Sequence, residues 1–182
     1  MNFMRNLFGK EQKEDAPLPS AEILEEAKKI FFEYSCNGLH MAQNDVNFSQ
    51  YHISKELQTE WRNEFVAHWR SRLSTEDMTP IQKLRDATAV EIIPDLLAMV
   101  GQGDSYARLR IAEALRALSY MLDNDKNLKK HAKETGIKLA QSILDGPIQV
   151  SEKHKTEIAR YGSSNPEEYI ILFAKSAADK KR

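Results

Sequence analysis

The stretch that most constrains the fold spans residues 92–122, where two apolar segments flank a glycine-rich turn. Gly101 can end a first helix in the left-handed conformation, and Asp104 can cap a second one. Apolar residues then recur three and four positions apart, as they do on one face of a helix. The pattern predicts a helical hairpin. Pro94 opens its first arm, and we expect no continuous helix across Ile93, because a residue before proline is disfavoured in the α region.

Turn-forming residues are too rare for a β fold. The 182 residues include only 7 Gly and 6 Pro, whereas sandwiches and barrels need a turn signal roughly every 8 to 12 residues. We therefore expect an all-α protein, a short irregular helical stack or bundle of about six to eight helices. The length favours a single helical domain over residues 20–178, with a flexible N-terminal segment at 1–19 and a basic tail at 179–182.

Several hairpin residues fall where a HEAT repeat would place them, namely Pro94, Asp104, Arg108, Ala112, Ala114, Leu115 and Leu118. The stretch resembles a HEAT-like helical repeat, with Ala107 in place of the usual Val and Ile111 in place of an Ala. This resemblance implies that Asp104 and Arg108 stabilise the turn. One repeat cannot bury its own face, and no second copy of the spacing follows. A compact irregular bundle that contains this hairpin therefore remains the alternative.

Residues 50–74 are expected to form the longest helix and carry two ladders at four-residue spacing. The apolar ladder is Ile53, Leu57, Trp61, Phe65, Trp69 and Leu73. Each step of four overshoots a full turn by about 40°, so the stripe spirals and predicts a bridging helix with neighbours on more than one side. The polar ladder, one position earlier, is His52, Glu56, Glu60, Glu64, His68 and Arg72.

The polar ladder has two interpretations. Carboxylates and imidazoles at i and i+4 share a face, so Glu56, Glu60, Glu64 and His68 could hold a metal ion or transfer protons, as in a helical-bundle enzyme. The same spacing also makes a solvated face of ion pairs. A metal site would need ligands from a second helix, such as a Glu-x-x-His pair, and the sequence shows none, so no metal or cofactor is predicted.

Three further expectations concern helix boundaries and one thiol. Thr79 and Pro80 predict a helix over 80–91, with Thr79 as its cap. A helix over 124–145 contains Gly136, which we expect to kink it or to end a first segment. Cys36 lacks a neighbouring His and is interpreted as a buried structural thiol rather than a nucleophile.

The formal net charge of −1 hides an uneven distribution. Residues 1–100 carry 11 Lys and Arg against 16 Asp and Glu, while residues 101–182 carry 15 against 11. The possible interaction residues in the basic half are Lys126, Lys129, Lys130 and Lys133. They could meet an acidic protein or nucleic-acid phosphates. A pI of about 6.5 and the lack of interleaved basic and aromatic residues argue against nucleic acid.

Composition and sequence pattern also indicate in which cellular compartment the protein is expected. A single cysteine forms no internal disulfide, no apolar run reaches about 18 residues, and no signal peptide opens the chain. A cytoplasmic location is the simplest expectation. Residues 1–10 form a short amphipathic segment that could dock on a membrane surface or a partner, although its apolar area is small for anchoring.

These features favour a non-catalytic intracellular module for protein–protein interaction. The sequence lacks a phosphate-binding loop and a nucleophile–base signature. The predicted partner is another protein, with further copies of this chain as an alternative. An adaptor, an immunity-like protein and an assembly subunit are not distinguished. The metal or acid/base bundle enzyme and the phosphate-backbone binder remain the two alternative functions.

Overall fold

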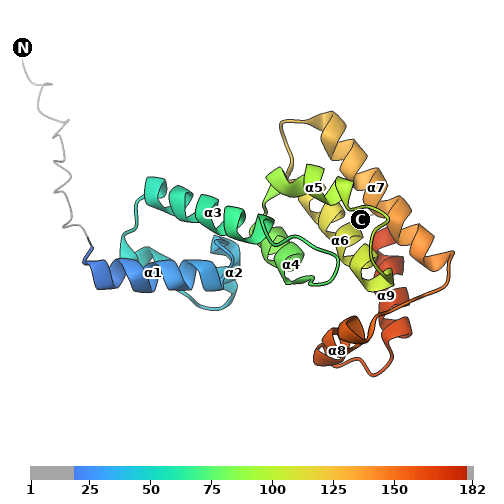
Figure 1. Cartoon of the computed structure of the whole chain (residues 1–182). Helices are drawn as coiled ribbons and strands as arrows, with labels where there is room; N and C mark the ends of the chain where they lie inside the picture. Colours follow the sequence, from blue (N-terminus) through green and yellow to red (C-terminus); the bar gives the residue numbers. More distant parts are fainter. Residues whose placement is uncertain (1–18, 180–182) are drawn as a thin grey trace, which may run out of the picture.

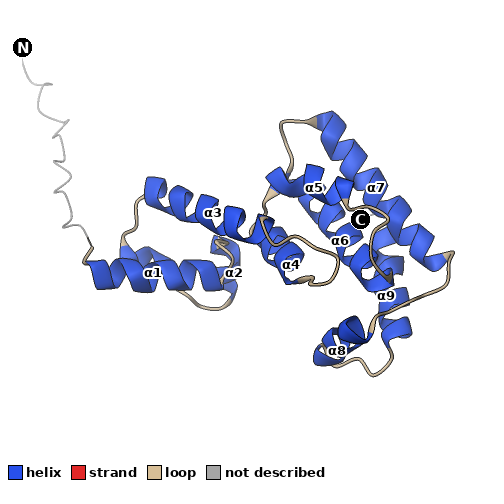
Figure 2. Ribbon diagram, viewed as in Figure 1, coloured by secondary structure: helices blue, strands red, loops and turns tan. Residues whose placement is uncertain are grey.

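The computed structural model describes residues 19–179 and contains only helices in that range (Figure 2). The α-helices are α1 (Ala21–Glu33), α2 (Gly38–Gln43), α3 (Lys55–Arg70), α4 (Thr79–Asp86), α5 (Ile93–Ala98), α6 (Ser105–Met121), α7 (Lys126–Leu144), α8 (Glu152–Arg160) and α9 (Pro166–Ala178). Two short 3-10 helices, η1 (Phe48–Tyr51) and η2 (Val90–Ile92), lie between them. The all-α prediction is confirmed. The N-terminal segment expected at 1–19 and the basic tail expected at 179–182 lie outside the described residues except for Pro19 and Asp179.

The helices form two lobes, each with its own buried cluster (Figure 1). The N-terminal lobe contains α1, α2, η1 and the first half of α3, packed around Ala27, Phe31, Met41 and Trp61. The C-terminal lobe contains α4 to α9. Its centre is α6, which packs against α4, α5, α7 and α9. Twelve of the 17 residues of α6 are buried, so the second arm of the predicted hairpin is the core element of this lobe.

Helix α3 joins the two lobes. Trp61 belongs to the N-terminal cluster, whereas Val66, five residues later, belongs to the C-terminal one, with Trp69 packed against it. A spiralling apolar stripe produces this change of partner, because each step of four turns the side chain further round the helix. The bridging role predicted from the stripe is therefore observed.

Several predicted helix boundaries are wrong. Helix α3 begins at Lys55 rather than at residue 50, because Ser54 caps it and His52 adopts a left-handed conformation with φ 50°. Helix α1 ends at Glu33 with Tyr34 as its C-cap, and Gly38 begins the separate helix α2. The helix expected over 80–91 is α4, which begins at Thr79 itself and is followed by the separate 3-10 helix η2. Thr79 is thus helical and not a cap.

The hairpin turn follows the prediction, but its first arm does not. Gly101 has φ +86°, and the Asp104 carboxylate accepts a hydrogen bond from Ala107 N–H at 2.9 Å, so it caps α6. Ile93, however, is helical with φ −52° and ψ −44°. Ile93 is the first residue of α5 and Pro94 is the second. The first turn of a helix does not need the backbone N–H that proline lacks. A 3-10 turn leads directly into α5, so the expected break is absent.

Gly136 does not end a helical segment, since α7 runs unbroken across it. A Cβ at this position would lie 2.8 Å from the backbone oxygen of Ala112 and 2.9 Å from Cγ of Arg116. The glycine therefore allows α7 to approach α6 closely. The low helix propensity of glycine suggested a break, but the close packing of the two longest helices outweighs it.

Candidate interaction site between the lobes

A cleft of about 440 Å³ lies where α1, α3 and α4 meet, and we call it the junction cleft. Its floor is aromatic: Phe32 from α1 and Phe65 and Trp69 from α3. Phe32 and Phe65 pack edge to face with ring centroids 5.3 Å apart, and Phe65 and Trp69 do so at 6.2 Å. Since Phe65 and Trp69 are successive members of the spiralling stripe, the turn of the stripe from one lobe to the other leaves these rings at the junction.

Charged side chains of both signs surround this floor. The rim consists of Lys29, Glu33, Glu64, His68 and Lys83. The His68 imidazole stands edge-on to the Trp69 ring, with centroids 5.0 Å apart. Lys83 donates a hydrogen bond to the backbone oxygen of Glu33 at 3.4 Å, which ties α4 to the end of α1. The cleft thus combines an apolar floor with a polar rim, as the centre and edge of a protein interface do.

One rim residue is held by a salt bridge between the helices. The ammonium of Lys28 lies 2.6 Å from a carboxylate oxygen of Glu64 and 5.4 Å from the centroid of the Phe32 ring. Both side chains are partly exposed, so the pair contributes less than about 1 kcal/mol to stability. Its main effect is to fix the position of Glu64 beside the aromatic floor.

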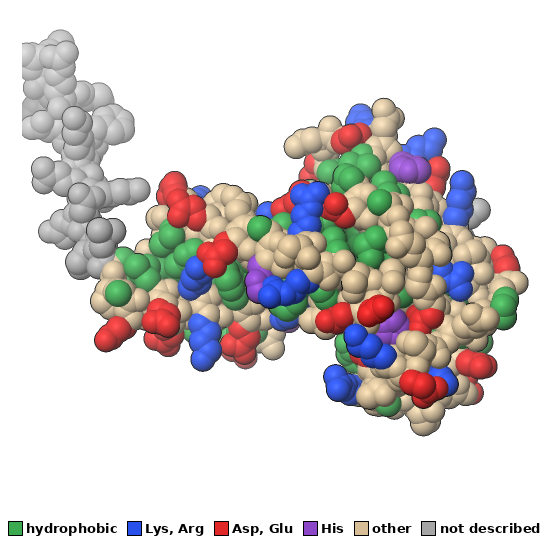
Figure 3. All heavy atoms as spheres, in the orientation of Figure 1, with side chains coloured by type: hydrophobic (Ala, Val, Ile, Leu, Met, Phe, Trp, Pro, Cys, Tyr) green, Lys and Arg blue, Asp and Glu red, His purple; other side chains and the backbone are tan. Residues whose placement is uncertain are grey.

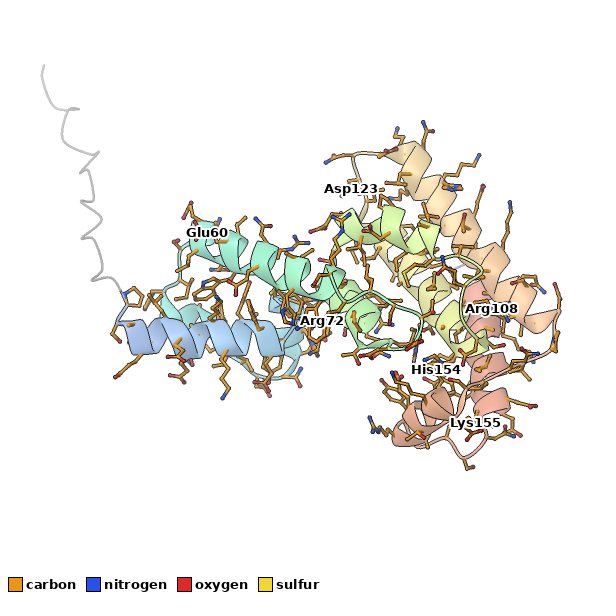
Figure 4. All side chains as sticks on the ribbon, viewed as in Figure 1. Glu60, Arg72, Arg108, Asp123, His154 and Lys155 are labelled. Atoms are coloured by element: carbon orange, nitrogen blue, oxygen red, sulfur yellow. The ribbon has the colours of Figure 1, made fainter. Side chains whose placement is uncertain are left out.

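The structure separates the four residues of the predicted metal or acid/base ladder. Glu64 and His68 lie on the rim of the junction cleft. Glu56 and Glu60 are exposed on the first half of α3, and Figure 4 shows Glu60 well away from the lobe junction. Within residues 19–179, no group of three His, Cys, Asp or Glu side chains is arranged to hold a metal ion. His52 does not belong to the helix at all.

Asp104 joins the beginnings of α6 and α8. One carboxylate oxygen caps α6, and the other accepts a hydrogen bond from Ser151 N–H at 2.7 Å and lies 2.7 Å from Nδ1 of His154. Burial opposes ionisation of this carboxyl group, but the bonds from Ser151, Ala107 and His154 outweigh it and lower the pKa of Asp104. Figure 4 shows His154 between α8 and the C-terminal core.

The His154–Asp104 pair has a structural geometry rather than a catalytic one. His154 is only 2% exposed, and its ring packs 5.1 Å from that of Tyr106. Its Nε2 atom is buried and has no hydrogen-bond partner among the described residues, so no substrate reaches it. Sequence analysis missed His154, because it lies 50 positions along the chain from Asp104.

Arg108, the other residue predicted to stabilise the turn, donates a hydrogen bond to the hydroxyl of Ser105 in its own helix at 3.3 Å.

A buried arginine is the second polar feature that sequence analysis missed. The Arg110 guanidinium lies 2.8 Å from Glu113 and donates hydrogen bonds to the hydroxyls of Tyr169 at 2.7 Å and Tyr106 at 3.1 Å. Burial disfavours its charge, but Glu113 and Tyr106 together more than compensate and raise the pKa of Arg110. Tyr106 in turn donates to Glu157 at 2.9 Å. The network connects α6 with α8 and α9, and of the Arg110 guanidinium nitrogens the buried Nε has no hydrogen-bond partner among the described residues.

Two larger hollows are less suited to recognition. A groove of about 540 Å³ between α4 and α8 is lined by polar groups already engaged with each other, such as Gln82, Glu157 and Tyr161. A hollow of about 660 Å³ under α2 and η1 contains Cys36, and burial raises the pKa of that thiol to about 12. The junction cleft is more apolar than either, and of these three hollows among the described residues it is the one lined by both lobes.

Comparisons with known proteins return no matching family model, no similar curated protein and no similar solved structure. The HEAT-like character of the hairpin therefore stays a resemblance carried by its own residues. Among the described helices, none combines the length and apolar character that a membrane crossing requires.

Proposed function

We propose that this protein is an intracellular, non-catalytic module for protein–protein interaction that receives an apolar side chain of its partner in the junction cleft. The observation that carries the proposal is the aromatic floor of Phe32, Phe65 and Trp69 within a rim of mixed charge. Interfaces gain most of their affinity from a few apolar or aromatic anchors that fill such hollows, while the rim excludes water.

The size of the cleft sets the scale of the interaction. A hollow of about 440 Å³ is at the small end of the range for ligand sites, which is roughly 300 to 1,000 Å³. It suits one or two large apolar side chains rather than an extended ligand. Full burial of one such side chain contributes about 1.5 to 3 kcal/mol, so loss of the anchor weakens binding roughly tenfold to hundredfold.

The mixed rim supports a protein partner over a polyanion. Glu33 and Glu64 would repel phosphates, whereas Lys29 and Lys83 offer contacts to carboxylates. Charges of both signs around an apolar centre fix the orientation of a protein partner and reject wrong ones. The split of charge between the two halves of the chain is consistent with this role.

Site-specific photo-crosslinking tests the proposal. A benzophenone amino acid replaces Lys29 or His68 on the rim, and matched controls replace Glu60 on the far part of α3 or Lys138 on α7. All four side chains are exposed. We expect the two rim positions to capture the same protein in cells, and the two controls to capture none.

The other outcomes are also decisive. Equal capture at all four positions, or none at the rim, would overturn the role of the cleft. An adduct with twice the mass of the chain would assign the cleft to self-association instead of a separate partner.

A further inference from the structure

A second surface, distinct from the junction cleft, combines exposed and partly exposed lysines with exposed apolar side chains. Lys126, Lys129, Lys130 and Lys133 occupy the first two turns of α7. Their spacing of i, i+3, i+4 and i+7 puts them on one face of the helix. Figure 3 shows basic side chains along the edge of the molecule that α7 forms. We call these four lysines, together with Tyr120 and Met121, the α7 surface.

The apolar part of this surface comes from the end of α6. Tyr120 is 42% exposed and Met121 is 57% exposed. The Lys133 ammonium lies 4.9 Å from the centroid of the Tyr120 ring, so the lysines and the apolar side chains form one continuous patch. Exposed apolar side chains that lie together inside a polar rim mark interaction sites, whereas scattered single ones do not.

The acidic residues nearby neutralise this patch only weakly. Lys129 pairs with Asp123, which lies in the loop before α7 (Figure 4), and Lys130 pairs with Glu134, each at 3.9 Å. Both pairs are largely exposed to water, where such contacts are worth little. The ammonium groups therefore remain able to bind carboxylates of a partner.

Helix electrostatics disfavour lysines at this position. The amino-terminal end of a helix carries a partial positive charge, and the first turn of α7 contains Lys126 and Lys129 but no acidic residue. The cap Asp125, which accepts from Leu128 N–H at 2.9 Å, and the loop residue Asp123 partly offset this positive charge. A sequence that breaks a local rule of folding does so most often at a functional site.

We propose that the α7 surface binds an acidic segment of a partner protein that also carries an apolar side chain. The lysines would contact the carboxylates, and the apolar side chain would lie on Tyr120 and Met121. Complementary charge favours an acidic occupant. The exposed Met121 thioether favours a protein over nucleic acid, since it adds apolar area that phosphates cannot use. This surface lies in the C-terminal lobe and does not depend on the role of the junction cleft.

Fluorescence anisotropy with defined probes tests the proposal on the full chain. The main probe is a labelled 16-residue peptide with Glu at most positions and Leu and Phe at helical spacing, and its control has Gln in place of every Glu. A single-stranded RNA oligonucleotide and phosphatidylserine vesicles test the other anionic occupants. We expect the acidic peptide to bind more tightly than the other three probes, and its affinity to fall with added salt.

Variants locate the binding site. The double change Lys126→Glu and Lys130→Glu should weaken peptide binding at least about tenfold, and Met121→Ser should weaken it by roughly threefold. Lys138→Glu on the same helix and Lys155→Glu on α8 are the matched controls, each expected to stay within about twofold. His68→Glu, at the junction cleft, should have no effect on this binding, which separates the two surfaces.

Each alternative result overturns the proposal. Equal binding of the Glu and Gln peptides would exclude charge recognition, and unchanged affinity in the double variant would place the site elsewhere. Tighter binding of RNA or vesicles that the double variant abolishes would assign the surface to that ligand instead. Circular dichroism of each variant, and the milder pair Lys126→Gln and Lys130→Gln, exclude a loss caused by unfolding.

Discussion

Replacing Gly136 by alanine tests the packing at the centre of the C-terminal lobe. The added Cβ would lie 2.8 Å from the backbone oxygen of Ala112, closer than a carbon and a carbonyl oxygen normally approach. Helices α6 and α7 must move apart, and overpacking of this kind costs about 1 to 3 kcal/mol. Alanine regains up to about 1 kcal/mol through its higher helix propensity. The steric term prevails because the contacted atom belongs to the backbone and cannot rotate away.

We therefore expect Gly136→Ala to lose about 1 to 2 kcal/mol, and Gly136→Val to lose more. For a chain of this size the alanine variant should melt about 3 to 6 °C lower, measured by circular dichroism at 222 nm. Gly38→Ala is the matched control, because Gly38 begins α2 and a Cβ there would meet nothing within 4 Å. A Gly136→Ala protein as stable as the wild type would refute the close approach of α6 and α7.

Three further predictions concern single side chains. Asp104→Ala removes the α6 cap and the partner of buried His154, and should cost about 2 to 4 kcal/mol in urea unfolding, whereas Arg108→Ala should cost less than about 1 kcal/mol; equal losses would contradict the capping role. Because the folded-state pKa of Asp104 is lowered, its stabilisation is complete above the unfolded pKa and is lost as pH falls through the folded one. The difference in the free energy of unfolding between wild type and Asp104→Asn should thus be widest near pH 7 and should narrow below about pH 4. A difference that does not change with pH would show that the ionised carboxylate does not stabilise the fold. Burial raises the pKa of Cys36 to about 12, so iodoacetamide at pH 8 should modify the native thiol on the order of a hundredfold more slowly than the urea-unfolded one; similar rates would show that the thiol is accessible.

Local signals in the sequence predicted the elements that depend on neighbouring residues. Gly101 and Asp104 define the hairpin turn, and a glycine that needs φ +86° together with a capping carboxylate leaves few other conformations. The four-residue stripe through Trp61, Phe65 and Trp69 likewise predicted that α3 bridges two sets of neighbours. In both cases the information lies within one or two helical turns.

Features made by distant residues could not be predicted in this way. The junction cleft combines side chains near positions 30, 66 and 83, and the periodicity of any one helix does not show which helices meet. The same holds for Asp104 and His154, which come from different helices. At Gly136 a local signal was misleading. The low helix propensity of glycine suggested a break, whereas the role of this residue in packing depends on the facing backbone of Ala112 in another helix.

The four Glu and His side chains of the polar ladder do not share one environment, for a physical reason. Side chains at i and i+4 are neighbours, but over the three such steps from Glu56 to His68 the row winds round the helix as the apolar stripe does. Glu56 and His68 therefore face different surroundings, and only Glu64 and His68 reach the junction cleft.

The affinity of the partner captured at Lys29 or His68 tests the central claim most directly. Isothermal titration would compare the wild type with Trp69→Ala, which shortens the aromatic floor, and with His68→Glu, which alters only the exposed rim. Glu60→Ala on the same helix serves as the control. We predict that Trp69→Ala binds roughly tenfold to hundredfold more weakly, that His68→Glu is also weakened, and that Glu60→Ala matches the wild type. Affinities within about twofold of the wild type for both cleft variants, with their folds intact, would contradict the junction cleft as the site of interaction.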